Sequence, residues 1–380
     1  MGSDRLIAAA DSLPPGEPSG PRIGEGSSAG PLRGMTLAEM RSWLERLGEP
    51  PYRARQLYEG IYRRAVRSME EMTNLPLALR RRLAAESRLG GVALLRAQGP
   101  PSGTRKLLFG LADGRLIEGV LMRDEGKGRT SLCVSSQVGC AVGCTFCLTG
   151  YGGFQRHCSA DEIVDQVLTV RRELLGPDES LHGVVFMGMG EPMLNLGAVI
   201  PALRLLSDPD GVGLSPRRMT VSTAGIVPGI EAFGRAGTGA NLAVSLNATT
   251  DAVRDALMPL NRRWPIGELI EACRRLPLKP RQRITIEYVL LRGVNDSPED
   301  ARRLVRLLRP LRCKVNLIMF NPHELLDYGP VPEATLDGFC RTLAEARYTV
   351  SVRWSKGREI EAACGQLAAH YFEPRAAPVS

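Results

Sequence analysis

Apolar and polar residues alternate along the chain with two different rhythms. Over residues 36–88 the apolar side chains recur at helical spacing. Thr36 and Glu39 have the spacing of an N-terminal capping box, and Gly48 ends the first helical run. Two further helical runs place apolar residues from position 54 to 62 and from 77 to 83. This part of the chain therefore predicts a small helical domain.

From Ser131 onward, short β-rich runs alternate with amphipathic helical runs. The expected strands are Ser131–Ser135, Gly183–Met187, Met219–Thr223, Leu242–Leu246, Ile284–Leu290 and Lys314–Met319. The expected helices include Ala160–Leu174, Val253–Met258, Ile266–Leu276 and Ala301–Leu308. Such alternation is typical of parallel βαβ units in an α/β fold. Six such strands predict an open, partial (β/α)6 barrel, and a doubly wound sheet is the alternative.

The change of rhythm also gives an expected domain organisation. Residues 1–34 are rich in Gly, Pro and Ser and predict a disordered leader. The remaining segments are the helical domain over 35–90, a β-rich connection over 91–130, the barrel over 131–350, a C-terminal segment over 351–372 and a tail over 373–380.

Charge and composition narrow the class of protein. The 380 residues contain 49 Lys plus Arg against 41 Asp plus Glu, a net charge of +8 that fits a polyanionic partner without requiring one. Residues 36–88 combine many arginines with Tyr52, Tyr58 and Tyr62, which suits RNA binding as well as an ordinary amphipathic bundle. No apolar run is long enough for a membrane span, and no signal peptide is visible, which predicts a cytoplasmic protein.

The nine cysteines of such a chain are expected to be reduced, so metal binding, redox chemistry or burial must explain them. Cys140, Cys144 and Cys147 form a C-x3-C-x2-C run on one short loop. A [4Fe–4S] cluster normally takes four cysteine ligands, so three leave one iron open to a substrate. The alternative is a zinc site with Cys133 as the fourth ligand.

The cysteine spacing, with the aromatic Phe146 before the last cysteine, resembles the radical S-adenosylmethionine (SAM) superfamily. The whole chain resembles one member of it, the RlmN/Cfr family of RNA adenine methyltransferases, over about residues 36–370. The matching motifs are Pro51–Gln56, Met72–Pro76, Leu132–Cys140, Gly188–Pro192, Glu287–Leu290, Gly293–Asp296, Asn316–Pro322 and Ala362–Leu367.

This resemblance implies a partial radical SAM barrel with an N-terminal helical accessory domain, a [4Fe–4S] cluster and two SAM molecules per turnover. It implies that Cys364 carries a methyl group, that Glu118 accepts the adenine ring proton, and that Cys133 then releases the product by forming a disulfide with Cys364. The positions that match SAM contacts are Gly190, Glu191, Ser222, Ser245, Leu246, Asn247 and Asn321.

The implied reaction places a methyl group on C2 of adenine in 23S rRNA, with tRNA as a second substrate. The alternatives are Cfr-like methylation of C8 and, more remotely, a zinc-stabilised RNA-binding module without catalysis. Two positions depart from the usual pattern, because Asn247 stands where much of the family has His, and Gly150 is typical of some Cfr-type members. The expected partners are RNA and an electron donor such as flavodoxin, with no membrane and a monomeric enzyme.

Overall fold

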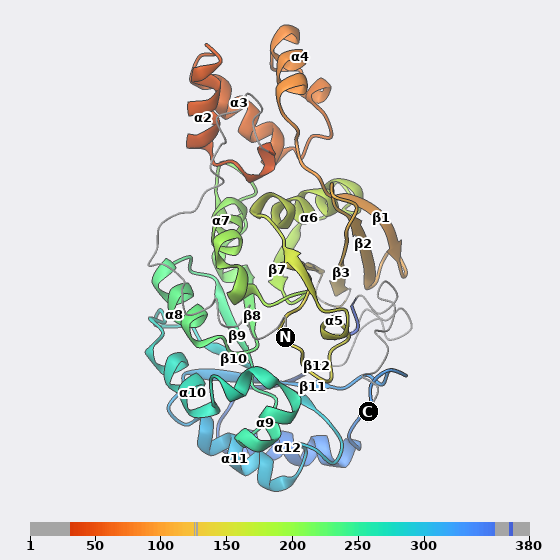
Figure 1. The fold of residues 1–380 in the computed structure, drawn as a ribbon, viewed down its shortest axis with the longest axis vertical. Coiled ribbons are helices and arrows are strands. Elements are labelled where there is room, and N and C mark those ends of the chain that lie inside the picture. The colour runs from red at the N-terminus through yellow and green to blue at the C-terminus, as the bar shows by residue number, and fades with distance from the viewer. Residues whose placement is uncertain (1–30, 125, 127, 354–364, 368–380) are drawn as a thin grey trace.

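A mixed sheet of ten strands forms the centre of the computed structural model, which describes residues 31–124, 126, 128–353 and 365–367 (Figure 1). The strand order is β1-β2-β3-β4-β7-β8-β9-β10-β11-β12. The strands are β1 (Ala93–Gln98), β2 (Arg105–Gly110), β3 (Leu116–Asp124), β4 (Arg129–Cys133), β7 (Leu181–Phe186), β8 (Met219–Thr223), β9 (Asn241–Ser245), β10 (Ile284–Leu290), β11 (Cys313–Met319) and β12 (Val350–Arg353). A separate two-stranded ribbon joins β5 (Gln137–Gly139) and β6 (Phe154–His157).

Six neighbouring strands, β4 and β7 to β11, are the six that the sequence predicts, and they pair in parallel. Helices follow these strands and surround the sheet (Figure 1). They are α5 (Leu148–Tyr151), α6 (Ala160–Glu173), α7 (Leu196–Ser207), α8 (Val227–Ala236), α9 (Asp251–Leu257), α10 (Ile266–Arg275), α11 (Pro298–Leu308) and α12 (Glu333–Glu345). Short helical turns are η5 (Pro192–Asn195), η6 (Pro216–Arg218) and η7 (Pro259–Arg262). No helix in the described part of the chain is long and apolar enough to cross a membrane.

The register of the parallel strands gives the sheet two different faces. Side chains alternate between the faces along a strand, and register partners on neighbouring strands share a face. One face is apolar and at most 1% exposed at Leu132, Val184, Val221, Val244, Ile286 and Leu317. The opposite face, called the lumen face below, carries Cys133, Thr220, Ser222, Ser245, Thr285, Glu287, Lys314 and Asn316.

Strands outside the six predicted ones extend the sheet at both edges. Before β4, the strands β1 to β3 pair antiparallel and correspond to the β-rich connection expected over 91–130. After β11, β12 adds another parallel strand that the sequence pattern did not indicate. The β3–β4 register pairs Val120 with Cys133, so Glu118, two residues before Val120, also points to the lumen face.

The N-terminal helical domain consists of η2 (Leu32–Gly34), α2 (Leu37–Arg46), α3 (Tyr52–Tyr58), η3 (Glu59–Arg63), η4 (Met69–Glu71) and α4 (Leu77–Glu86). It stands at one end of the molecule, beyond α6 and α7 (Figure 1). The capping box of Thr36 and Glu39 is formed, and Gly48 adopts φ +80° beyond the end of α2, as the sequence predicts. The domain contacts α7's end through Tyr58, whose hydroxyl donates to Asp208 at 2.7 Å, and Arg55, which pairs with Asp210 at 2.8 Å.

Residues 31–34 correct the predicted boundary of the leader. They were expected to belong to a disordered leader that extends to residue 34, yet Leu32 is fully buried and η2 packs against α6. The reason is the side chain of Arg33. Nothing in the Gly- and Pro-rich sequence around it indicates that this arginine is buried. Arg33 is 3% exposed and forms a buried ion pair with Asp165 of α6.

This Arg33–Asp165 pair connects three parts of the chain. Arg33 also donates to the carbonyl of Val66 at 2.9 Å, and the second carboxylate oxygen of Asp165 accepts the backbone N–H of Val92 at 3.0 Å. The hydroxyl of Thr169 donates to Asp165 at 3.3 Å. One carboxylate on α6 therefore fixes η2, the helical domain and the chain entering β1.

Breaking this pair should destabilise the fold strongly. We expect Asp165→Asn to lower the free energy of unfolding by about 3–5 kcal/mol, because it leaves the Arg33 cation buried without its counter-ion. Denaturant unfolding of the full chain measures the change. The exposed Arg41–Glu45 pair is the control, since Glu45→Gln should cost at most about 1 kcal/mol. Equal effects of the two substitutions would contradict this assignment.

Candidate active site

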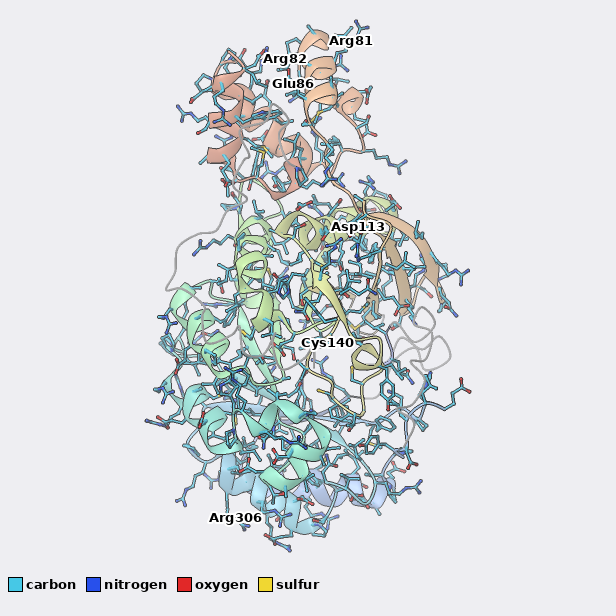
Figure 2. The ribbon with its side chains drawn as sticks, in the orientation of Figure 1. Arg81, Arg82, Glu86, Asp113, Cys140 and Arg306 are labelled. Carbon is cyan, nitrogen blue, oxygen red and sulfur yellow. The ribbon has the colours of Figure 1, made fainter. Side chains whose placement is uncertain are left out.

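The predicted site residues gather at the carboxyl ends of the parallel strands. The Cys140–Cys147 loop follows β4 and β5, and the Gly188–Pro192 turn follows β7. Ser245 ends β9, and Asn321 follows β11 by two residues. Ligands of parallel α/β proteins collect at this edge of the sheet. Figure 2 labels Cys140 beside α5 in the barrel part of the molecule, whereas Arg81 and Arg82 of α4 lie at the outer end of the helical domain.

The three-cysteine loop is shaped by glycine and anchored by backbone hydrogen bonds. Gly139 has φ +76°, and a Cβ atom there would lie 1.8 Å from the carbonyl oxygen of Gly153 on the neighbouring ribbon, so only glycine fits. Within the loop, the N–H of Thr145 donates to Leu257 at the end of α9, and its hydroxyl contacts the Tyr328 hydroxyl at 2.7 Å. The loop is therefore held from several sides before any metal binds.

The electrostatics of the loop fit a bound cationic cluster. Burial, followed by the charge of Cys147, raises the pKa of the Cys140 thiol to about 12. Burial and the charges of Cys147 and Cys140 also raise the pKa of Cys144 well above its usual value. A negative charge on Cys147 therefore opposes ionisation of the other two thiols. A metal cluster supplies the positive charge that lets all three ionise.

The zinc alternative requires Cys133 as a fourth ligand beside the three loop cysteines. In the described ranges, neither these thiols nor any other three His, Cys, Asp or Glu side chains are gathered around one point as ligands of a single metal ion. Cys133 is buried at the end of β4, outside the loop. A [4Fe–4S] cluster spreads its thiolates around four irons instead of one ion, which matches three cysteines spaced along a loop.

Glu191 closes the turn after β7 and lies beside the cysteine loop. Its carboxylate accepts the backbone N–H groups of Met193 at 2.9 Å and Ala224 at 2.6 Å, so it joins this turn to the end of β8. Burial raises the pKa of Glu191 to about 7, although these hydrogen bonds oppose the shift. Gly190 adopts φ +100°, and a Cβ there would lie 2.4 Å from the Gln137 side chain. The turn therefore depends on both predicted residues.

The end of β9 explains why asparagine suits position 247. Asn247 has φ +55°, a left-handed conformation that asparagine tolerates better than most residues. Its buried side chain accepts the N–H of Val289 at 2.9 Å, and its carbonyl accepts from Asn295 at 2.7 Å. These contacts tie β9 to β10. Asn247 thus has a structural role. The two residues before it, Ser245 and Leu246, accept hydrogen bonds from Arg254 through their carbonyls.

Arg254 is a site residue that sequence reasoning missed. It lies on α9, is fully buried, and donates to the carbonyls of Leu246 at 3.0 Å and Ser245 at 3.2 Å. It also donates to Asn261 at 3.0 Å, and its positive charge opposes the rise in the pKa of Cys144. No local pattern marks this arginine, because only the folded chain removes it from water. It positions the β9 turn beside the cysteine loop.

The residues expected to act on the substrate lie on the lumen face. Glu118 of β3 is 2% exposed, and Lys106 of β2 pairs with it at 3.2 Å from an equally buried position. Lys106 is the register partner of Val120, so it shares this face, but the sequence analysis did not single it out. Ser222 donates to Glu287 at 3.3 Å on the same face. Asn321 is also buried, beyond the end of β11.

Cys364 lies outside the described residues, but the next residues along the chain contact the cysteine loop. The carbonyl of Gly365 accepts the N–H of Leu148 at 2.7 Å, and that of Leu367 accepts the hydroxyl of Thr149 at 3.2 Å. The ideal Cβ position of Gly365 is 3.7 Å from the Cα atom of Cys147. The C-terminal segment therefore returns to the cluster loop immediately after position 364.

Two family models match the chain, one for each part of the fold. The model described as "Radical SAM superfamily" matches residues 134–305, from the end of β4 into α11. The model described as "Ribosomal RNA large subunit methyltransferase N-terminal domain" matches residues 31–89, which are the helical domain with η2.

Relatives match over almost their whole length. A "Dual-specificity RNA methyltransferase RlmN" from Syntrophobacter fumaroxidans is 48% identical over 340 residues, covering 90% of this chain and 98% of that protein. The protein of the same description from Geobacter sulfurreducens is 48% identical over 88% of this chain and 91% of its own. The crystal structure of a radical SAM methyltransferase from Sphaerobacter thermophilus has a TM-score of 0.86 and 44% identity, over 90% of this chain and all of that one.

These comparisons confirm the expected radical SAM fold and the expected cofactors, a [4Fe–4S] cluster and SAM with two molecules used per turnover. They also favour the RlmN branch over the Cfr-like alternative, since the relatives at 46–48% identity carry the RlmN description. Both family models match this one chain, and the relatives align with about nine tenths of it. The chain therefore belongs to the RlmN family of radical SAM RNA methyltransferases.

Proposed function

We propose that this chain methylates C2 of adenine in RNA, with 23S rRNA and tRNA as its substrates. The observation that carries the proposal is the arrangement of the lumen face, where Glu118 and Cys133 lie on adjacent strands and Gly365 contacts the cysteine loop. Proton transfer and sulfur chemistry can then act on one base. The proposal includes a monomeric enzyme in the cytoplasm and an electron donor such as flavodoxin.

Cys140, Cys144 and Cys147 would hold the cluster, with SAM at the open iron. Gly190, Glu191, Ser222, Ser245, Leu246, Asn247 and Asn321 are the proposed contacts of SAM. When bound, the cluster and SAM supply the one-electron chemistry that C2 requires, because this electron-poor ring carbon does not attack a methyl group as an amine would. Glu191 and Arg254 keep the turns of this pocket in place through the hydrogen bonds described above.

The proposed steps at the protein's own atoms use three residues. The sulfur of Cys364 carries the methyl group as a thioether, and this carbon becomes bonded to C2 of the base. Glu118 takes the ring proton. The Cys133 thiolate then attacks the sulfur of Cys364, so that an S–S bond forms and the S–C bond breaks, and the released carbon on the base keeps the electron pair and takes up a proton to complete the methyl group. The position of Cys133 supports this role, because it is buried at the end of β4 on the lumen face that also carries Glu118.

The helical domain is the proposed holder of the RNA. Its arginines and the exposed Tyr52 suit phosphate and base contacts, and Arg53 lies over the Tyr52 ring at 4.8 Å. Several of its arginines are engaged in surface ion pairs, such as Arg41 with Glu45, so only part of the positive charge is available to RNA. The domain therefore has features of both interpretations of the sequence, an RNA-binding surface and an amphipathic bundle with a charged outer face.

Cys364→Ala should retain its iron but form no 2-methyladenosine, because the methyl carrier is absent. The measurement is anaerobic turnover with SAM, a reductant and unmodified 23S rRNA, followed by digestion to nucleosides and mass spectrometry. Cys340→Ala, at a half-buried cysteine of α12 with no assigned role, is the matched control and should behave as the wild type. An 8-methyladenosine product from the wild type would overturn the C2 assignment.

Cys133→Ala should accumulate a covalent protein–RNA adduct, because the thiolate that releases the product is missing. A denaturing gel of the same reaction, with labelled RNA, detects the adduct. Cys158→Ala replaces another buried cysteine, to which no role is assigned, and should show no adduct. Full turnover by Cys133→Ala without any adduct would remove Cys133 from the proposed role.

Lys106 should assist proton transfer to Glu118. Lys106→Met removes the buried cation that lies 3.2 Å from the Glu118 carboxylate, so we expect methylation to fall by about 10-fold to 100-fold. Lys106→Arg keeps the charge and should recover much of the rate. The measurement is the methylation rate at equal iron content, and an equal loss in Lys106→Met and Lys106→Arg would indicate a merely structural lysine.

A further inference from the structure

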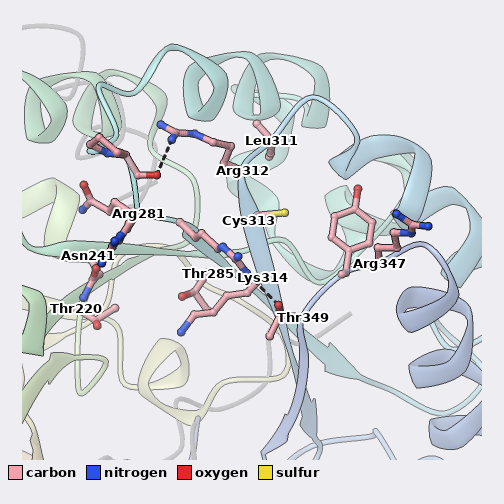
Figure 3. Close-up of a pocket in the computed structure, with 14 residues that line it drawn as sticks. Thr220, Asn241, Arg281, Thr285, Leu311, Arg312, Cys313, Lys314, Arg347 and Thr349 are labelled. Atoms are coloured by element: carbon pink, nitrogen blue, oxygen red, sulfur yellow. Dashed lines mark hydrogen bonds between the residues drawn. The ribbon is translucent and has the colours of Figure 1, made fainter.

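A basic cavity opens at the end of the barrel opposite to the active site. It has a volume of about 860 Å³ and lies where β8 to β12 begin, whereas the cysteine loop lies where the strands end. Its lining includes Arg281, Arg283, Thr285, Arg312, Lys314 and Arg347 (Figure 3). The cavity therefore belongs to no part of the site described above.

All the charged side chains that line this cavity are positive. Five of its residues are Arg or Lys, and none is Asp or Glu. No ion pair with a carboxylate within 4 Å is formed by any of these five among the described residues. This differs from the helical surfaces of the protein, where arginines such as Arg302 and Arg306 pair with Glu299. A concave surface with an excess of positive charge concentrates anions.

Only some of the N–H groups of these five Arg and Lys side chains form hydrogen bonds within the protein. Arg312 donates to the carbonyls of Leu278 and Pro280, and Arg283 donates to the Thr349 hydroxyl at 3.0 Å (Figure 3). These bonds hold the rim in shape. For Arg281, Lys314 and Arg347 the described residues provide no such partner, so their N–H groups remain available.

The floor of the cavity is the lumen face of the sheet. Thr285 is 5% exposed, its register partner is Lys314, and both line the cavity. Burial and the positive charge of Arg353 lower the pKa of Lys314, with Arg283 contributing in the same direction and Glu287 opposing it. Added negative charge in the cavity would relieve this repulsion. Threonine hydroxyls beside Arg and Lys are the usual donors to a phosphate group.

We propose that this cavity is a binding site for phosphate groups. Guanidinium groups on the rim and the ammonium and hydroxyl groups on the floor complement the tetrahedral oxygens of a phosphate or phosphodiester. The volume is large enough for more than one phosphate group. The ligand is either the backbone of bound RNA or a free oligophosphate, and the site itself does not depend on which base the enzyme methylates.

The test uses the full chain with its cluster and two double variants of equal charge. Arg281→Gln with Arg283→Gln removes two rim cations of the cavity. Arg235→Gln with Arg341→Gln removes two exposed cations from α8 and α12, outside the lining. Calorimetric titration with sodium tripolyphosphate at low salt measures direct binding. The cavity variant should weaken it about 10-fold or more, and the control variant should leave it nearly unchanged.

The second arm measures binding of unmodified 23S rRNA fragments against salt concentration. If the RNA backbone is the source of the phosphate, the cavity variant should reduce the slope of log affinity against log salt by about 2 relative to the wild type and to the control variant. If tripolyphosphate binding is lost and the slope is unchanged, a free oligophosphate occupies the site. No measurable tripolyphosphate binding by the wild type, or equal weakening in both variants, would overturn the proposal.

Discussion

The in-register pairing of neighbouring parallel strands is the constraint on which the rest of the structure depends. It places every second side chain on the apolar face against the helices and the others on the lumen face. A slip of one residue in any strand would exchange the two sets and bury polar groups among the helices. Because the register is fixed, Glu118 and Cys133 lie on the same face of the sheet. Glu118 belongs to the antiparallel strand β3, and Cys133 belongs to β4, the first strand of the barrel.

Much of this fold could be predicted from the sequence because its signals are local. The six strands are short β-rich runs, and the capping box of Thr36 and Glu39 is visible three residues apart. The elements that were missed lack such signals. The helix α7 contains Pro201 in its interior, and β12 is a four-residue edge strand. The packing of residues 31–34 depends on Arg33 and on a carboxylate more than a hundred residues away, which no local pattern contains.

The candidate site divides in the same way. The cysteine loop and the turn at Gly190 and Glu191 could be predicted, because tight loops around a ligand need particular residues in sequence. Arg254 and Lys106 could not, because their roles arise from burial beside partners on other elements. Asn247 could be predicted from the sequence only in part. Its position was predicted, while its backbone conformation and its hydrogen bonds to β10 explain why an amide suits it.

Glu287 links the two ends of the lumen. Burial raises its pKa, whereas Arg353, the Ser222 hydroxyl, Asn316 and Lys314 each favour its charged form. Lys314 also lines the basic cavity, so one ammonium group serves both a buried carboxylate and the cavity. An anion in the cavity and the carboxylate of Glu287 would therefore share the same positive charge. Ser222 donates to Glu287 at 3.3 Å from the next but one strand, so the same carboxylate also receives a hydrogen bond nearer the active-site end of the sheet.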